Sequence, residues 1–169
     1  MRRVIAHLDA NGAKALDALH AAYPSITTDK ISLGISEEGR DVWAMKISDN
    51  PGTQESEPEV LFDGMHHARE PMAMECTLYY MQWLCENYGT DPDATFILDN
   101  SHVYITPMIN PDGIDLDTRY NSRQVDLNRN YPYEWTPASD HGSGPASEIE
   151  VSSNIAFIDK HDVCMTDRD

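Results

Sequence analysis

A histidine and a glutamate stand three positions apart in the segment His67-Ala68-Arg69-Glu70. At this spacing an imidazole nitrogen and a carboxylate oxygen can face one point from a single turn of the chain. Zinc binds both kinds of atom, and a hydrolytic zinc site has three protein ligands and one water. His67 and Glu70 are therefore candidate zinc ligands, although the pair also fits a solvated turn with a glutamate at a helix start. His66 has a different spacing to Glu70, and we expect it to be a neighbour of the site.

A second polar cluster contains Arg119, Asp126, Asn128 and Arg129. A guanidinium group binds a planar carboxylate through two parallel hydrogen bonds, and an asparagine amide can add a donor. Another arginine could polarise a carbonyl group under attack. An aspartate can hold a metal-bound histidine by its second ring nitrogen. The alternative is that these are loop residues paired with some of the many carboxylates of the chain.

The pattern along the chain predicts helices that alternate with strands. We expect helices over 13–22, 71–88, 92–99 and 147–160, and strands near 30–36, 41–48, 59–62, 102–109 and 163–165. The last helix starts from a capping-box spacing between Ser147 and Glu150. This alternation indicates an α/β fold with a mixed β-sheet and flanking helices. Both polar clusters follow a strand, so they are expected to meet at one edge of the sheet.

The totals for the chain limit the classes of function. The 169 residues suit one domain, and 40% of them are hydrophobic, which argues against disorder. The formal net charge of −17 argues against a nucleic-acid partner, because phosphates need a basic surface. No apolar run reaches the length that spans a bilayer. We therefore expect neither nucleic acid nor a membrane as a partner.

The chain start and the cysteines give weaker expectations. Met1 is followed by two arginines but not by the apolar stretch of a signal peptide. Taken literally, the chain is not exported, but an internal methionine of a longer precursor would give the same start, so the compartment stays open. Cys76, Cys85 and Cys164 lack metal-ligand spacing, and we expect all three to be core thiols.

Four motifs occur in an order that resembles one known family. They are Gly64-Met65-His66-His67-Ala68-Arg69-Glu70-Pro71, Asn110-Pro111-Asp112-Gly113, Arg119 with Val125-Asp126-Leu127-Asn128-Arg129-Asn130, and Ser147-Glu148-Ile149-Glu150. In this order they resemble the motifs of the M14 zinc metallocarboxypeptidases, with Ile149 where that family usually has proline. The resemblance covers nearly the whole chain. It implies an incomplete zinc-carboxypeptidase-like fold and an enzyme that releases C-terminal amino acids from peptides or proteins.

The resemblance also implies a metal site and a mechanism. His67 and Glu70 would bind one Zn²⁺ ion, and Asp126 would be the hydrogen-bond partner of His67. Water bound to zinc would then attack the last peptide bond of the substrate. In the family, a third ligand, a histidine, ends the strand that follows the helix near 147–160, and a glutamate further along activates the water. We expect both beyond residue 169, so residues 1–169 would be a single partial domain that lacks its C-terminal portion.

The remaining roles implied by the resemblance concern the substrate. Arg119 would polarise the scissile carbonyl, and Arg123 is its rival for this role. Asn128 and Arg129 would hold the terminal carboxylate of the substrate, while Arg69 would line a neighbouring subsite. His161 and His141 are possible substitutes for the third zinc ligand, but the first is expected at a helix end and the second in a loop.

Two alternatives to the carboxypeptidase hypothesis stay open at this level. The chain could be a truncated, non-catalytic remnant that binds peptide carboxylates, because the third ligand and the base are absent from it. It could also be a relative that hydrolyses acyl-amino acids or cell-wall peptides with the same zinc geometry.

Overall fold

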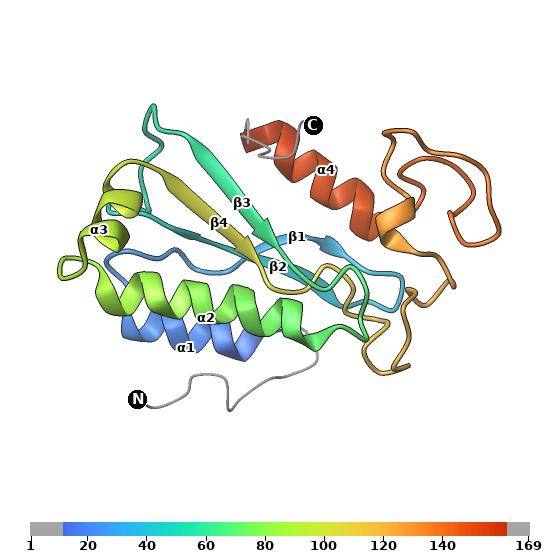
Figure 1. Ribbon diagram of the computed structural model, residues 1–169, viewed down its shortest axis with the longest axis horizontal. Helices are drawn as coiled ribbons and strands as arrows, with labels where there is room; N and C mark the ends of the chain where they lie inside the picture. Colours follow the sequence, from blue (N-terminus) through green and yellow to red (C-terminus); the bar gives the residue numbers. More distant parts are fainter. Residues whose placement is uncertain (1–11, 162–169) are drawn as a thin grey trace.

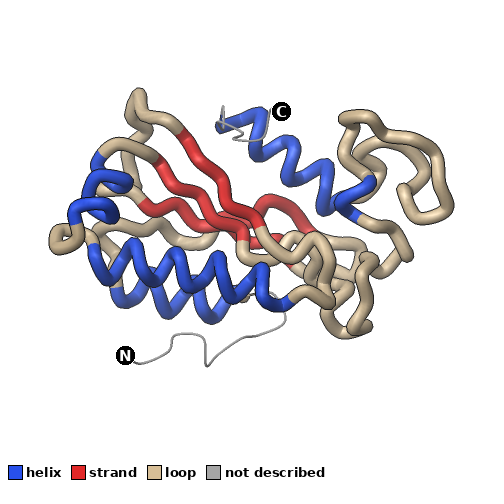
Figure 2. The backbone as a smooth tube through the Cα atoms, viewed as in Figure 1, coloured by secondary structure: helices blue, strands red, loops and turns tan. Residues whose placement is uncertain are grey.

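The computed structural model describes residues 12–161, which form helices packed on a four-stranded sheet (Figures 1 and 2). The elements are α1 (Ala13–Ala22), β1 (Ile31–Ile35), β2 (Asp41–Ile47), β3 (Glu59–Asp63), α2 (Pro71–Asn87), α3 (Pro92–Asp99), β4 (His102–Thr106), the short 3₁₀ helix η2 (Leu127–Arg129) and α4 (Ile149–His161). Each predicted helix and strand within this range is present. The strand expected at 163–165 lies outside the described residues, as does Cys164.

The sheet has the strand order β1-β2-β4-β3. β1 pairs with β2, and β2 with β4, in antiparallel directions, whereas β3 and β4 are parallel and pair Phe62 with Ile105. The predicted mixed α/β fold is therefore confirmed. The turn between β1 and β2 contains Gly39, whose φ of 84° is the left-handed conformation that glycine adopts at little cost.

Helices cover both faces of the sheet. α1 and α2 lie side by side on one face, and α4 crosses the other (Figure 1). The alternation of β2 explains this arrangement, since successive side chains of a strand point to opposite faces. Met45 and Ile47 join the core beneath α1 and α2. Val42 packs on the other side with Leu127 and Val151.

Local signals in the sequence account for the ends of the helices. α2 begins at Pro71, whose missing N–H costs nothing at the first helical position. It ends before Gly89, which has a φ of 77°. Asp91 caps α3, because its side chain accepts hydrogen bonds from the backbone N–H groups of Asp93 and Ala94.

Two expectations from the sequence are wrong. The capping box of α4 does not form, because Ser147 Oγ donates to Glu148, while neither carboxylate oxygen of Glu150 has a hydrogen-bond partner. Cys76 is exposed on α2 and is not a core thiol, although Cys85 is buried as expected. Within residues 12–161, no helix combines the length and apolar character needed to span a bilayer.

Candidate functional site

Two chain segments meet beyond the carboxyl ends of the parallel strands β3 and β4. The N–H of Gly64 donates to the carbonyl of Thr106 at 2.9 Å, and the N–H of Ile109 donates to the carbonyl of Gly64 at 2.9 Å. A Cβ atom at Gly64 would lie only 2.9 Å from the carbonyl oxygen of Pro107, so a larger residue would push the segments apart. This contact brings the two predicted polar clusters to one edge of the sheet.

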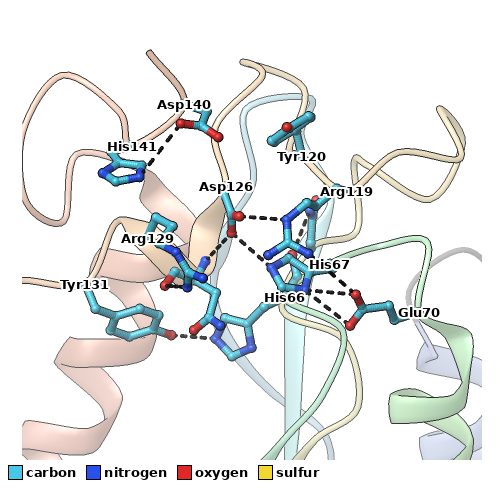
Figure 3. Close-up of polar contacts among 12 residues, drawn as sticks. His66, His67, Glu70, Arg119, Tyr120, Asp126, Arg129, Tyr131, Asp140 and His141 are labelled. Carbon is cyan, nitrogen blue, oxygen red and sulfur yellow. Dashed lines mark hydrogen bonds and ion pairs between the residues drawn. The ribbon is translucent and has the colours of Figure 1, made fainter. Parts of the chain in front are cut away.

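The imidazole of His67 lies between two carboxylates (Figure 3). Its Nδ1 atom is 3.1 and 3.2 Å from the two oxygens of Glu70, and its Nε2 atom is 3.0 Å from Oδ1 of Asp126. His67 is only 9% exposed, whereas the Glu70 side chain is 52% exposed. One nitrogen of the ring therefore faces the chain interior, and the other faces an accessible carboxylate.

Asp126 connects His67 to the second cluster. Its carboxylate also accepts a hydrogen bond of 2.8 Å from Nε of Arg119 and one of 3.0 Å from the backbone N–H of Asn128. Burial alone would raise the pKa of Asp126, but the hydrogen bonds from Arg119 and His67 outweigh it and lower the pKa. Asp126 is therefore an anion that positions two neighbouring side chains.

Arg119 lies inside this group, whereas Arg123 lies outside it. The Nη1 atom of Arg119 is 3.7 Å from Oε1 of Glu70, so its guanidinium spans the space between Glu70 and Asp126. Arg123 instead faces Glu37 at 4.0 Å and Glu148 at 3.7 Å.

Asn128 and Arg129 lie on η2, directly after Asp126, and both are exposed. The Nη1 atom of Arg129 donates to the carbonyl of Asn128 at 3.1 Å, and Figure 3 draws its side chain on the Tyr131 side of Asp126. Arg69 is also exposed, and its backbone N–H donates to the carbonyl of Thr118 at 3.0 Å. These three side chains thus border the His67 group and are accessible to a ligand.

His66 takes part in a separate network. Its Nε2 atom is 2.8 Å from the hydroxyl of Tyr131, which also accepts a hydrogen bond of 2.9 Å from Nδ2 of Asn154 on α4. Burial lowers the pKa of His66 and raises that of Tyr131. Tyr131 and Asn154 could not be predicted from the sequence, because their partners are far away in the chain.

The turn at 110–113 contacts the backbone of the segment that carries His66 and His67. Asn110 Nδ2 donates to the carbonyl of His66 at 3.1 Å, and its Oδ1 accepts from the N–H of Gly113 at 3.0 Å. The buried carboxylate of Asp112 accepts hydrogen bonds from Ser36 at 2.7 Å and from Arg40 at 2.8 Å. This turn therefore joins the β1–β2 hairpin to the site.

The other two candidate imidazoles are occupied elsewhere. Nδ1 of His141 lies 2.7 Å from the carbonyl of Thr136, and its Nε2 is 3.8 Å from Asp140. Nδ1 of His161 lies 3.4 Å from Oε2 of Glu59, at the start of β3 and hence at the opposite end of the strand from His67.

The geometry of His67 and Glu70 fits a zinc ion. Nδ1 and the two Glu70 oxygens converge on one region, while the carboxylate of Asp126 fixes the remote ring nitrogen, as is usual for metal-bound histidines. These residues would supply two of the three protein ligands of a hydrolytic zinc site.

A different group of ligand-type residues was not predicted from the sequence. Among residues 12–161, Glu55, Glu57 and His102 have ligand atoms within 4.8 Å of one another. The alternating glutamates at 55, 57 and 59 were the available signal. This group lies at the start of β3 and β4, away from His67.

Comparison with known proteins identifies the class to which this architecture belongs. The model of the M14 peptidase family, described as zinc carboxypeptidase, matches residues 13–166. Carboxypeptidase SOL1 of Arabidopsis thaliana is 41% identical over 109 residues, which are 64% of this chain and 22% of that protein. The chain therefore belongs to the zinc carboxypeptidase family.

Solved structures agree with this assignment. Carboxypeptidase A from Helicoverpa armigera superposes with a TM-score of 0.77 and 29% identity, over 88% of this chain and 41% of that one. Bovine thrombin-activatable fibrinolysis inhibitor, in complex with tick carboxypeptidase inhibitor, has a TM-score of 0.72 and 25% identity, over 86% and 54% of the two chains. The chain thus spans under a quarter of the curated relative and about half or less of these structures.

Proposed function

We propose that this chain is part of a zinc metallocarboxypeptidase that releases C-terminal amino acids from peptides. The observation that carries the proposal is the position of His67, whose Nδ1 faces Glu70 while Nε2 faces Asp126. Membership of the zinc carboxypeptidase family supports zinc as the metal. Bound zinc lowers the pKa of a coordinated water toward neutrality and polarises carbonyl oxygens.

In this proposal each residue of the site has one task. His67 and Glu70 hold the metal, and Asp126 keeps the His67 ring in the orientation that presents Nδ1. Arg119 donates to the oxygen of the scissile carbonyl as negative charge develops on it. Its Nε atom is held by the 2.8 Å hydrogen bond to Asp126, while its Nη1 atom points toward Glu70. This arrangement supports the task, because the guanidinium group is already oriented beside the proposed metal ligand.

Recognition of the substrate terminus is assigned to Asn128 and Arg129, with Arg69 beside a neighbouring subsite. Both η2 side chains are exposed next to the buried Asp126, so a carboxylate can reach them without rearrangement of the core. Peptide and protein C-termini are the proposed partners. Tick carboxypeptidase inhibitor is a protein partner of the bovine relative. The curated relatives reported as Carboxypeptidase SOL1 and Carboxypeptidase D favour this reading over a hydrolase of acyl-amino acids or cell-wall peptides. Measured turnover would distinguish it from a remnant that only binds peptide carboxylates.

We also propose that residues 1–169 are one part of a longer catalytic domain, with the third zinc ligand and the general base downstream. The 41% coverage of the Helicoverpa armigera enzyme supports this division. Sequencing the gene beyond codon 169 in all frames tests it. A histidine in the next few codons supports the proposal, and an unrelated continuation in every frame contradicts it.

Substitution of Arg129 tests the functional proposal in the enzyme that contains this chain. Arg129→Ala removes charge-assisted hydrogen bonds to a substrate carboxylate, so kcat/KM on peptides with a free C-terminus should fall about 10- to 100-fold. Turnover of C-terminally amidated peptides should change much less. Arg123→Ala, an exposed arginine outside the site, is the control. An equal loss on both substrates would exclude this role for Arg129.

A further inference from the structure

We propose a second site for a divalent metal ion, formed by Glu55, Glu57 and His102 at the amino ends of β3 and β4. The carboxyl ends of the same strands lead to His67, so the two sites lie at opposite ends of the sheet. The second ion would have no part in the proposed peptidase chemistry. It would hold the loop before β3, through Glu55 and Glu57, against His102 at the start of β4.

Strand register creates the base of this site. Glu59 and His102 are paired residues of the parallel strands β3 and β4. Oε1 of Glu59 lies 3.5 Å from Nδ1 of His102 and so faces that nitrogen of the ring. A carboxylate on one ring nitrogen is the usual arrangement behind a histidine that binds a metal through the other nitrogen. The free ligand position of His102 is therefore Nε2.

Among residues 12–161, the Nε2 atom of His102 is buried and has no hydrogen-bond partner. The side chain is fully buried, and Oε2 atoms of Glu55 and Glu57 are likewise buried and unpaired. An unpaired buried polar atom destabilises the fold. The ligand atoms of these three residues lie within 4.8 Å of one another, so one shared partner could satisfy all of them.

The spacing of these atoms suits a metal better than a direct hydrogen bond. Nε2 of His102 and Oε2 of Glu57 are 3.7 Å apart, which exceeds the usual hydrogen-bond range of about 2.7–3.2 Å. Zinc ligands at about 2.0–2.1 Å in a tetrahedron stand roughly 3.3–3.4 Å from one another. Small side-chain movements would shorten the 3.7 Å separation of Nε2 and Oε2 to the separation of two zinc ligands.

The charges around the site also favour a divalent cation. Three carboxylates face it from Glu55, Glu57 and Glu59, and one ammonium group from Lys46 partly offsets them. Nζ of Lys46 is held by a 2.8 Å hydrogen bond to the carbonyl of Thr53. The carboxylates outnumber this ammonium group, so a divalent ion would offset the excess negative charge.

The ligand types indicate the class of metal. An imidazole nitrogen with two carboxylates suits Zn²⁺ and, with lower affinity, Mn²⁺, whereas Ca²⁺ and Mg²⁺ prefer oxygen ligands alone. We therefore expect Zn²⁺ to bind more tightly than Mn²⁺, and an excess of Ca²⁺ or Mg²⁺ not to displace it.

Calorimetric titration of the metal-free chain with ZnCl₂ tests the proposal. The double variant His67→Asn/Glu70→Gln removes the proposed catalytic ligands, and one equivalent of Zn²⁺ should still bind to it. Adding Glu57→Gln should weaken this remaining binding at least 10-fold. Glu57 is partly exposed, so its substitution perturbs the core less than one at His102. Glu37→Gln, at an exposed glutamate on the β1–β2 turn, should leave the binding unchanged.

Two results would overturn the second site. One is the absence of Zn²⁺ binding in the double variant at pH 7.5. The other is binding that Glu57→Gln does not weaken. His102→Gln provides an independent check, since it should also abolish binding if circular dichroism shows that the variant is folded. Failure of the peptidase proposal would leave each of these outcomes unaffected.

Discussion

The Nε2 atom of His67 lies 3.0 Å from Oδ1 of Asp126, although 59 positions separate the two residues in the chain. This contact fixes the ring so that Nδ1 turns toward the accessible carboxylate of Glu70. A ring held in this way needs little further ordering to bind a metal, which lowers the entropic cost of coordination.

Asp126→Asn should weaken zinc binding about 10- to 100-fold, because the amide cannot stabilise the His67 ring as the carboxylate does. Competition with a chromogenic chelator measures the affinity. Asp140→Asn is the matched control, since the Asp140 side chain contacts His141 rather than His67. Unchanged affinity in Asp126→Asn would show that the 3.0 Å contact does not support metal binding.

Arg119→Ala in the enzyme that contains this chain should lower kcat about 10²- to 10³-fold, the usual loss when one oxyanion donor is removed. KM should change little, because the interaction is strongest in the transition state. Steady-state kinetics on one dipeptide substrate separates the two constants. A loss of similar size in Arg123→Ala would reverse the assignment of these two arginines.

Glu150→Gln should stabilise the chain at alkaline pH. The Glu150 side chain is buried without a hydrogen bond, and burial raises its pKa from the ordinary value of 4.5 to about 7. The folded chain thus retains a proton that the unfolded chain has released. This contribution to stability is complete below about pH 4.5 and is lost as the pH rises through 7.

Glutamine keeps the neutral form at every pH. Urea unfolding should therefore show a gain of up to about 3 kcal/mol for Glu150→Gln at pH 8 and little change at pH 4.5. Glu37→Gln should have no effect at either pH. A gain of the same size at both pH values would mean that it does not arise from the ionisation of Glu150.

Gly113→Ala should destabilise the turn beneath the histidine segment. An added Cβ would lie 2.4 Å from the carbonyl oxygen of Tyr120 and 2.8 Å from Cβ of Ala68, and neither neighbour can move freely. Overpacking of this kind costs about 1–3 kcal/mol. Gly52→Ala, which meets no atom within 4 Å, should change stability by less than about 0.5 kcal/mol. Thermal unfolding measures both effects, and equal unfolding midpoints for the two variants would contradict this prediction.

The elements of the fold were predictable where their signals are local. Pro71 and Gly89 mark the ends of α2, and the alternation around Met45 marks β2, because each depends on a few adjacent residues. Ser147 shows the limit of such signals. Its hydroxyl was expected to cap α4, but it accepts a hydrogen bond from Asn130 and donates to Glu148, so tertiary partners override the capping pattern.

The prediction of the site depended on the order of the four motifs more than on any single residue. His67 and Glu70 were predicted as a pair from spacing, but nothing local connects them with Asp126. Glu57 and His102 were missed for the same reason, since only the register of β3 and β4 brings the loop before β3 beside His102. Contacts between segments that are distant in the chain cannot be predicted from the local patterns of a single sequence.

One amide holds the long irregular segment that follows η2. Nδ2 of Asn130 donates to the carbonyls of His141 and Gly144 at 2.8 and 3.0 Å, and its Oδ1 accepts from the N–H of Glu148 at 3.0 Å. Asn130 therefore holds the far part of this segment and the start of α4, whatever residues occupy the exposed part between them. Because Asn130 directly follows Arg129, the same hydrogen bonds also restrict the backbone beside the side chain that we propose binds the substrate carboxylate.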